Sequence, residues 1–186
     1  MTETEPNQIQ TDPWRALGLE RTYDVDPDDV RRAHRKKSAL LHPDRAPGLD
    51  DSEIARASAE INDAKRVLLD PEDRAAALLA LLGGASASED RSLPDGFLEE
   101  TMMLRMEIES ELAEGGDEAR AKWRGWAQDK RRGYEAEVAE LFGRATGDGV
   151  LAEIRLVLNA WRYTERLIEQ LDPAYSGLDD AADTQA

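Results

Sequence analysis

The sequence predicts an all-α protein in two parts, a helical hairpin with a His-Pro-Asp loop followed by a three-helix antiparallel bundle. Three observations lead to this fold class. Apolar residues recur at intervals of three and four, the spacing of one helix face. Asp-Pro pairs and short glycine runs divide that pattern into separate helices. The clearest break in composition runs from Gly83 to Ser88, and we place the boundary between the two parts there.

The first part is expected over residues 12–84. Asp12 and Asp26 each precede a proline, and this pair favours a helix start because aspartate caps the free N–H groups and proline fits the first helical position. Pro43 should end the second helix, because its ring cannot continue one. Asp70 and Pro71 end a third helix and begin a fourth. The predicted helices cover residues 13–19, 27–42, 52–70 and 71–82.

The second part is expected to begin with a linker over residues 85–93 and to form a three-helix bundle over residues 94–171. Short glycine-containing connections between its helices favour antiparallel neighbours. Its helices are predicted over residues 94–113, 117–145 and 149–171. The inner stripe predicted for the middle helix consists of Ala119, Trp123, Trp126, Lys130, Tyr134, Val138 and Leu141. Residues 1–11 and the acidic tail at 172–186 are expected to be disordered.

Composition narrows the classes of function. The formal net charge of −16 argues against general nucleic-acid binding, which needs a positive surface. The chain has no cysteine, which excludes disulfides and thiolate metal sites. It has only two histidines and no phosphate-binding glycine loop, so we expect no enzyme activity, catalytic residue, metal site or cofactor. No apolar run is long enough to span a membrane, and the polar start is unlike a signal peptide, so we expect a cytoplasmic protein with no membrane partner.

The second predicted helix carries a concentrated basic face. Arg31, Arg32, Arg35 and Lys36 spread over one side, opposite a less polar side. The less polar side consists of Val30, Ala33, His34, Lys37 and Leu41. This helix leads directly into the tripeptide His42-Pro43-Asp44, in which a rigid proline turn would present an imidazole and a carboxylate. The alternative interpretation is a solvated charged helix followed by an ordinary turn.

This segment resembles the J domain, the module that stimulates ATP hydrolysis by DnaK-class chaperones. The motif from Asp12 to Leu19 is similar to the first helix of that family, and those at 61–64 and 68–71 are similar to its third helix. The resemblance implies that Arg31, Arg35 and Lys36 contact an acidic chaperone surface. It also implies that the tripeptide His42, Pro43 and Asp44 triggers the ATPase. The chain departs from the family at Lys37, usually apolar, and at Leu40 and Leu41, which replace a common basic-aromatic pair.

The rest of the chain is similar to HscB, the J-type co-chaperone of iron-sulfur cluster assembly. Three segments carry this likeness, at residues 70–83, 97–107 and 161–167, whereas the middle bundle helix matches only in length and pattern. The resemblance implies two partners: a DnaK/HscA-class ATPase chaperone, and an iron-sulfur scaffold protein as client of the bundle. It implies client contacts at Leu98, Met102, Met103, Met106 and Tyr163. Met103 and Met106 stand where the family usually has acidic residues.

The first bundle helix indicates a binding surface independently of that resemblance. Phe97, Thr101, Leu104 and Ile108 form a natural core stripe, and the Met and Leu side chains around it cannot all be buried as well. Exposed methionines make adaptable partner surfaces. The alternative is a helix packed on both faces, with Tyr163 in the core. For function, the alternatives are a J-domain co-chaperone of another client, or a structural interaction protein whose J domain is inactive.

Overall fold

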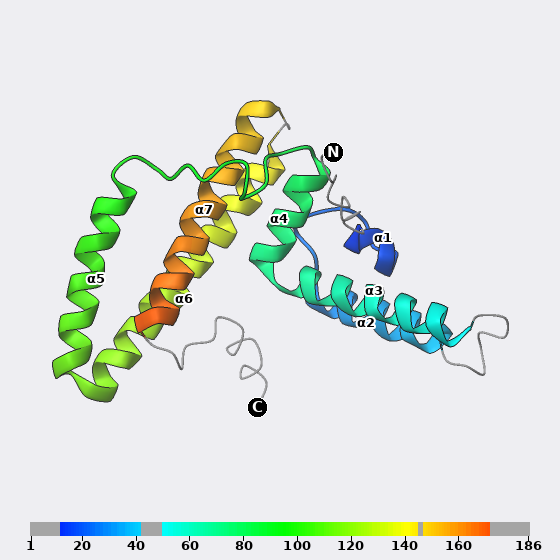
Figure 1. Ribbon diagram of the computed structural model, residues 1–186, viewed down its shortest axis with the longest axis horizontal. Helices are drawn as coiled ribbons and strands as arrows, with labels where there is room; N and C mark the ends of the chain where they lie inside the picture. The colour runs from blue at the N-terminus through cyan, green and yellow to red at the C-terminus, as the bar shows by residue number, and fades with distance from the viewer. Residues whose placement is uncertain (1–11, 42–49, 145–146, 172–186) are drawn as a thin grey trace, which may run out of the picture. The chain divides into compact units, whose positions relative to one another are not determined.

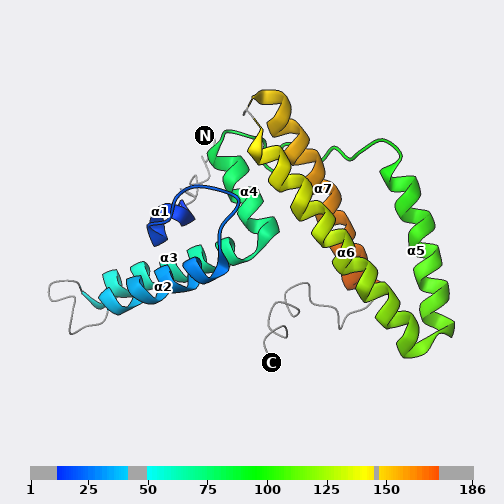
Figure 2. The same cartoon turned by 180° about the vertical axis from the view of Figure 1, so that it is seen from behind.

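The computed structural model describes residues 12–41, 50–144 and 147–171, and these residues contain helices and no strand. The chain divides into two compact units, and the division falls between Leu78 and Leu79. Figures 1 and 2 show the helices of each unit from opposite sides. The predicted all-α class, with a hairpin followed by a three-helix bundle, is confirmed.

The first unit is built around a helical hairpin. Its helices are α1 (Pro13–Leu17), α2 (Pro27–Leu40), α3 (Asp51–Leu69) and the first part of α4 (Pro71–Leu81). Helices α2 and α3 lie side by side, and α1 packs against both (Figures 1 and 2). Trp14, Val30 and Leu68 are fully buried in this unit, and the Trp14 indole N–H donates a hydrogen bond of 2.9 Å to the carbonyl of Thr22.

Local caps explain where these helices begin. The Asp12 carboxylate accepts hydrogen bonds from the backbone N–H groups of Trp14 and Arg15, at 3.1 and 3.2 Å. Asp26 caps α2 in the same way. Helix α3 begins one residue before the predicted Ser52, because Asp50 and Glu53 form a reciprocal capping box. Each cap satisfies N–H groups that have no partner within the helix.

The start of α4 is held to the first unit by an arginine. Arg74 is buried, and its guanidinium donates a 2.7 Å hydrogen bond to the carbonyl of Leu68. The same guanidinium lies 4.9 Å from the ring centre of Tyr23, within cation–π range. The carbonyl and the ring replace part of the lost hydration of this charge, whereas the Arg74 Nε has no hydrogen-bond partner among the described residues.

The second unit contains the bundle. After the rest of α4 it consists of α5 (Phe97–Glu114), α6 (Gly116–Gly143) and α7 (Asp148–Leu171). Helices α6 and α7 form an antiparallel pair, and α5 packs less extensively against both (Figures 1 and 2). Val138, Ile154, Leu158 and Trp161 form the fully buried centre of this unit. The Asn159 side-chain amide donates hydrogen bonds to the carbonyls of Asp90 and Ser92, at 3.1 and 2.9 Å, and so holds residues 90–92 against α7.

A polar network joins α6 to α7 inside the bundle. The Glu165 carboxylate is buried, and one oxygen accepts hydrogen bonds from Arg131 at 3.2 Å and from the Trp161 indole N–H at 3.1 Å. The Tyr134 ring stacks on Trp161 with 5.8 Å between ring centres, and its hydroxyl lies 3.0 Å from the Thr164 hydroxyl. Burial raises the pKa of Tyr134, whereas the hydrogen bond with Thr164 acts to lower it. The network satisfies polar groups that would otherwise destabilise the core.

Several expected boundaries and core positions differ in the structure. Helix α1 ends at Leu17, because Gly18 adopts a left-handed conformation with φ of 74° and caps the helix. Helix α5 begins at Phe97 and not at Pro94, since Gly96 has a φ of 77°. Lys130 was predicted on the inner stripe of α6 but is exposed, and Ala127 is buried. The expected disorder of residues 1–11 and 172–186 lies outside the described residues, and the linker at 85–93 stays a prediction.

Candidate partner-binding surfaces

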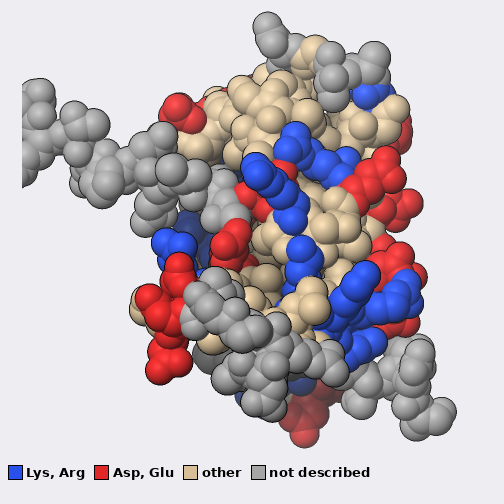
Figure 3. Space-filling view, turned by 90° about the vertical axis from the view of Figure 1, so that its right-hand side faces the viewer, with Lys and Arg blue, Asp and Glu red and all other residues tan. Residues whose placement is uncertain are grey.

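Helix α2 presents an exposed basic surface, here called the α2 basic face and made of Arg31, Arg32, Arg35 and Lys36. Arg31 forms an ion pair of 2.9 Å with Asp28, and Arg32 pairs with Asp29. Figure 3 shows the surface seen from the right-hand side of Figure 1, and several Lys and Arg side chains gather on the side in view.

The α2 basic face is only partly neutralised. Arg35 and Lys36 are exposed, and neither forms an ion pair with another residue of the described segments. Two cations in water on one helix side can attract an acidic partner over a distance of about 10 Å at moderate salt. The face is therefore suited to fast and salt-sensitive docking.

The opposite side of α2 is fixed against its neighbours. Val30 is fully buried, and the His34 imidazole Nε2 lies 2.7 Å from the Asn62 side-chain oxygen on α3. Lys37 is half-buried, and its Cε lies 3.7 Å from the place that a Cβ on Gly18 would occupy. These contacts set the rotation of α2, so the basic face points away from α3.

The tripeptide His42, Pro43 and Asp44 lies outside the described residues, so its geometry is not part of the structure. The chain leaves α2 at Leu41, whose N–H donates a 3.1 Å hydrogen bond to the carbonyl of Ser38. In the sequence the tripeptide directly follows Leu41, and residues 37–41 separate it from Lys36, the last residue of the α2 basic face. Its triggering role stays a prediction.

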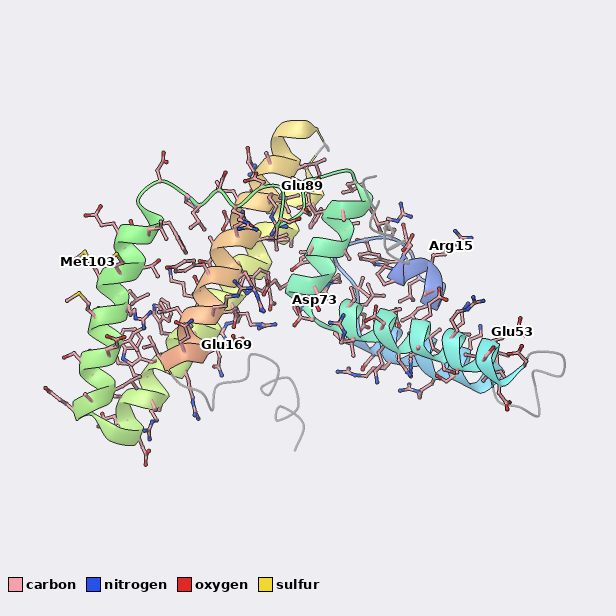
Figure 4. The ribbon with its side chains drawn as sticks, viewed as in Figure 1. Arg15, Glu53, Asp73, Glu89, Met103 and Glu169 are labelled. Carbon is pink, nitrogen blue, oxygen red and sulfur yellow. The ribbon has the colours of Figure 1, made fainter. Side chains whose placement is uncertain are left out.

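Helix α5 carries an exposed apolar surface, here called the α5 apolar strip and made of Leu98, Met102, Met103 and Met106. The exposed fraction is 50% for Leu98 and 67%, 69% and 71% for the three methionines in order. Figure 4 shows Met103 on the side of α5 that faces away from α6 and α7. Large apolar side chains clustered in water usually mark a surface that binds a partner.

The other face of α5 is the one that packs in the bundle. Thr101 and Ile108 are 8% and 2% exposed, and the Thr101 hydroxyl donates a 2.7 Å hydrogen bond to the carbonyl of Phe97. Phe97 and Leu104 are half-buried, in line with the predicted core stripe. The alternative in which α5 is covered on both faces is wrong for this structure. The function of the strip is still a prediction.

Tyr163 on α7 is connected to α5 through an aromatic contact. Its ring meets that of Phe97 edge to face, with 5.6 Å between centres and 85° between planes. Tyr163 is 40% exposed, so part of the ring remains available to a partner and the rest packs in the bundle. Phe97 was predicted only as a core residue. The sequence alone gave no sign of this contact, since the two residues belong to different helices.

The α5 apolar strip is bordered mainly by carboxylates. Glu99, Glu100 and Glu107 are exposed on α5 beside it, and Arg105 is paired with Glu109 at 2.8 Å. A partner would therefore need an apolar contact region with cations near its edge.

The residues that the structure describes contain neither a candidate metal site nor a candidate membrane-spanning helix. In these segments no group of three or more His, Cys, Asp or Glu side chains is arranged to hold a metal ion. None of the described helices combines the length and apolar character that crossing a membrane requires.

Comparison with known proteins gives consistent relatives. The DnaJ domain model matches residues 12–77. A co-chaperone protein HscB homolog of Neisseria meningitidis serogroup A is 35% identical over 91 residues, which are 47% of this chain and 55% of the relative. Co-chaperone protein HscB of Proteus mirabilis is 31% identical over 102 residues, 53% of this chain and 59% of the relative. The matched region thus spans little more than half the length of these relatives.

Longer matches extend the likeness over both units. An iron-sulfur cluster co-chaperone protein HscB homolog of Arabidopsis thaliana is 24% identical over 171 residues, 90% of this chain and 66% of the relative. The crystal structure of human HscB has a TM-score of 0.68 at 23% identity and covers 90% of this chain and 82% of its own, which supports the fold. Chaperone HscB from Vibrio cholerae has a TM-score of 0.61 at 27% identity, over 87% of this chain and 99% of its own. The chain therefore contains a DnaJ domain over residues 12–77 and is similar to HscB co-chaperones over both units.

Proposed function

We propose that this protein is a non-enzymatic co-chaperone of iron-sulfur cluster assembly. Its J domain would stimulate the ATPase of a DnaK/HscA-class chaperone, and its bundle would deliver an iron-sulfur scaffold protein. The names of the relatives support this role, because they describe HscB co-chaperones and, for the plant relative, iron-sulfur clusters. The observation that carries the proposal is the α5 apolar strip, exposed on a chain that also has an exposed cationic J-domain helix.

The chaperone half of the proposal depends on charge. Arg35 and Lys36 form no ion pair within the described segments. With Arg31 they would bring an acidic chaperone surface to α2, and His42, Pro43 and Asp44 would then act on the ATPase. Exposed charges contribute mainly to the association rate and to specificity, so this docking should weaken steeply with salt. No catalytic group of this chain is needed, because the chaperone hydrolyses its own ATP.

Charge reversal on α2 tests the chaperone half. Arg35→Glu should lower the apparent affinity in a steady-state ATPase assay by about tenfold, the effect of about 1.4 kcal/mol. Arg132→Glu is a matched control, because Arg132 is an exposed α6 arginine paired with Asp129. An Arg35→Glu protein that stimulates the ATPase with wild-type affinity would refute the role of the α2 basic face.

The client half of the proposal depends on apolar burial. Leu98, Met102, Met103, Met106 and Tyr163 would contact the scaffold, and side chains that begin at least 40% exposed have area left to bury. Burial of apolar area contributes about 25 cal/mol per Å² before the costs of association. Methionine side chains can also adapt their shape to the partner.

Scaffold binding tests the client half. Replacing Met102 and Met106 together by Asp should weaken affinity for the cognate scaffold by at least about a hundredfold, because two carboxylates would lose their hydration in the interface. Ala139→Asp places a carboxylate on an exposed position of α6 and serves as the control. Unchanged affinity of a folded Met102→Asp, Met106→Asp protein would exclude this surface.

One observation favours a second candidate, in which the J domain is kept and the client differs. Met103 and Met106 give the strip an apolar character where the family usually has acidic residues. A partner that binds through apolar contacts would carry a different binding surface from one that binds acidic residues through its own cations. Pull-down with wild type beside the Met102→Asp, Met106→Asp variant separates the two candidates, because the true client is lost only from the variant. An inactive J domain would appear as no ATPase stimulation at all.

A further inference from the structure

The sulfur chemistry of this chain is concentrated on one surface. The chain contains four methionines and no cysteine. Apart from Met1, the methionines are Met102, Met103 and Met106, and all three belong to the α5 apolar strip. The first compact unit has no sulfur atom between Thr2 and Leu78. An oxidant that attacks thioethers would therefore act on α5 and not on the core of either unit.

The three thioethers are also unusually open to attack. Each side chain is about two-thirds exposed, and each lies on the face of α5 opposite the buried Thr101 and Ile108. Susceptibility to oxidation increases with solvent access. No core residue has to move for a peroxide molecule to reach these sulfur atoms. Oxidation should therefore leave the packing of α5 intact.

We propose that Met102, Met103 and Met106 form a reversible oxidation site that switches off client binding. The oxidant class is a peroxide. The thioether sulfur attacks one peroxide oxygen, the O–O bond breaks and an S–O bond forms. The departing hydroxide takes the proton carried by the transferred oxygen, which leaves a sulfoxide and water. Sulfur loses two electrons and the peroxide gains them. Methionine sulfoxide reductases reverse the change with electrons from a dithiol.

The consequence for binding follows from polarity. A sulfoxide replaces a polarisable apolar group by a polar oxygen that needs a hydrogen-bond partner. An interface formed for thioethers offers no such partner, so burial would be penalised. We expect the loss of affinity to be on the order of tenfold or more when the three residues are oxidised. The J domain has no methionine in its described residues, so chaperone stimulation should persist.

This inference rests on the proposed client role of the α5 apolar strip. The experiment distinguishes failure of the oxidation site from failure of that client role. The full chain is treated with hydrogen peroxide, the peroxide is removed, and mass spectrometry counts additions of about 16 Da, one oxygen per sulfoxide. Circular dichroism checks the fold. Affinity for untreated cognate scaffold and ATPase stimulation are then measured, before and after incubation with methionine sulfoxide reductases.

A matched variant assigns the effect to these residues. In a Met102→Leu, Met103→Leu, Met106→Leu protein the strip remains apolar but cannot form sulfoxides. We expect peroxide to weaken scaffold binding by wild type only, the reductases to restore it, and ATPase stimulation to be unchanged. Failure of untreated wild type to bind the scaffold would refute the proposed function itself. The oxidation site is overturned if oxidised wild type binds as well as before, or if the leucine variant loses binding to the same extent.

Discussion

The buried ion pair between Arg131 and Glu165 gives the sharpest prediction of stability. Their side chains are 14% and 7% exposed and lie 3.2 Å apart, so neither charge is well hydrated. Arg131→Met keeps the aliphatic bulk but leaves the Glu165 carboxylate with the Trp161 indole as its hydrogen-bond donor. Breaking a buried pair in this way costs about 3–5 kcal/mol. We expect the bundle to be destabilised by about that amount.

Urea unfolding followed by far-UV circular dichroism measures this cost. With an m value of about 1.5 kcal/mol/M, a loss of about 3 kcal/mol lowers the midpoint by about 2 M. A double variant, Arg131→Met with Glu165→Gln, removes both charges and keeps an acceptor for Trp161, so it should recover much of the loss. Arg132→Met removes a neighbouring exposed arginine and should change stability by less than about 0.5 kcal/mol. Equal stability of wild type and Arg131→Met would refute the reasoning.

Three further predictions concern other parts of the chain. Ile108→Ala should lower the free energy of unfolding by about 2–5 kcal/mol in denaturant unfolding, because Ile108 is buried. Met102→Ala should change that free energy little and should weaken scaffold binding instead. The reverse pattern would contradict the assignment of the buried and exposed faces of α5. Partial burial acts to raise the pKa of Asp12, but hydrogen bonds from Arg21 and the α1 backbone lower it overall. Asp12→Ala should therefore cost about 1 kcal/mol at neutral pH. Because the folded pKa lies below the unfolded value of about 3.9, that difference from wild type should disappear as pH falls through the folded pKa in an acid titration. Asn159→Ala should increase amide hydrogen exchange in residues 90–92, and unchanged exchange would show that its two hydrogen bonds do not hold this segment.

Local signals in the sequence predicted most helix starts. The pairs Asp12-Pro13, Asp26-Pro27 and Asp70-Pro71 each stand at a helix start in the structure, because capping depends on residues close in the chain. The start of α3 was missed by one residue, although Asp50 and Glu53 have the spacing of a capping box. That signal was present in the sequence and overlooked.

Positions that depend on distant residues were harder to predict. Lys130 has the spacing of the buried Trp123 and Val138 but is exposed, and its ammonium group lies 5.8 Å from the centre of the Trp126 ring. No local pattern indicated that Arg131 on α6 pairs with Glu165 on α7, because the two residues are 34 positions apart in the sequence. The Phe97 contact with Tyr163 likewise needs the packed bundle. Exposure of the methionines was predictable, because α5 has more apolar residues than one face can bury.

The most direct test of the adaptor account is the steady-state ATPase rate of the cognate DnaK-class chaperone, measured with this protein, with its scaffold and with both. The account predicts that the full chain stimulates hydrolysis and that adding scaffold increases the effect. His42→Gln should abolish the stimulation, whereas Met102→Asp with Met106→Asp should remove only the scaffold-dependent part. A His42→Gln protein that stimulates hydrolysis as well as wild type would contradict the account.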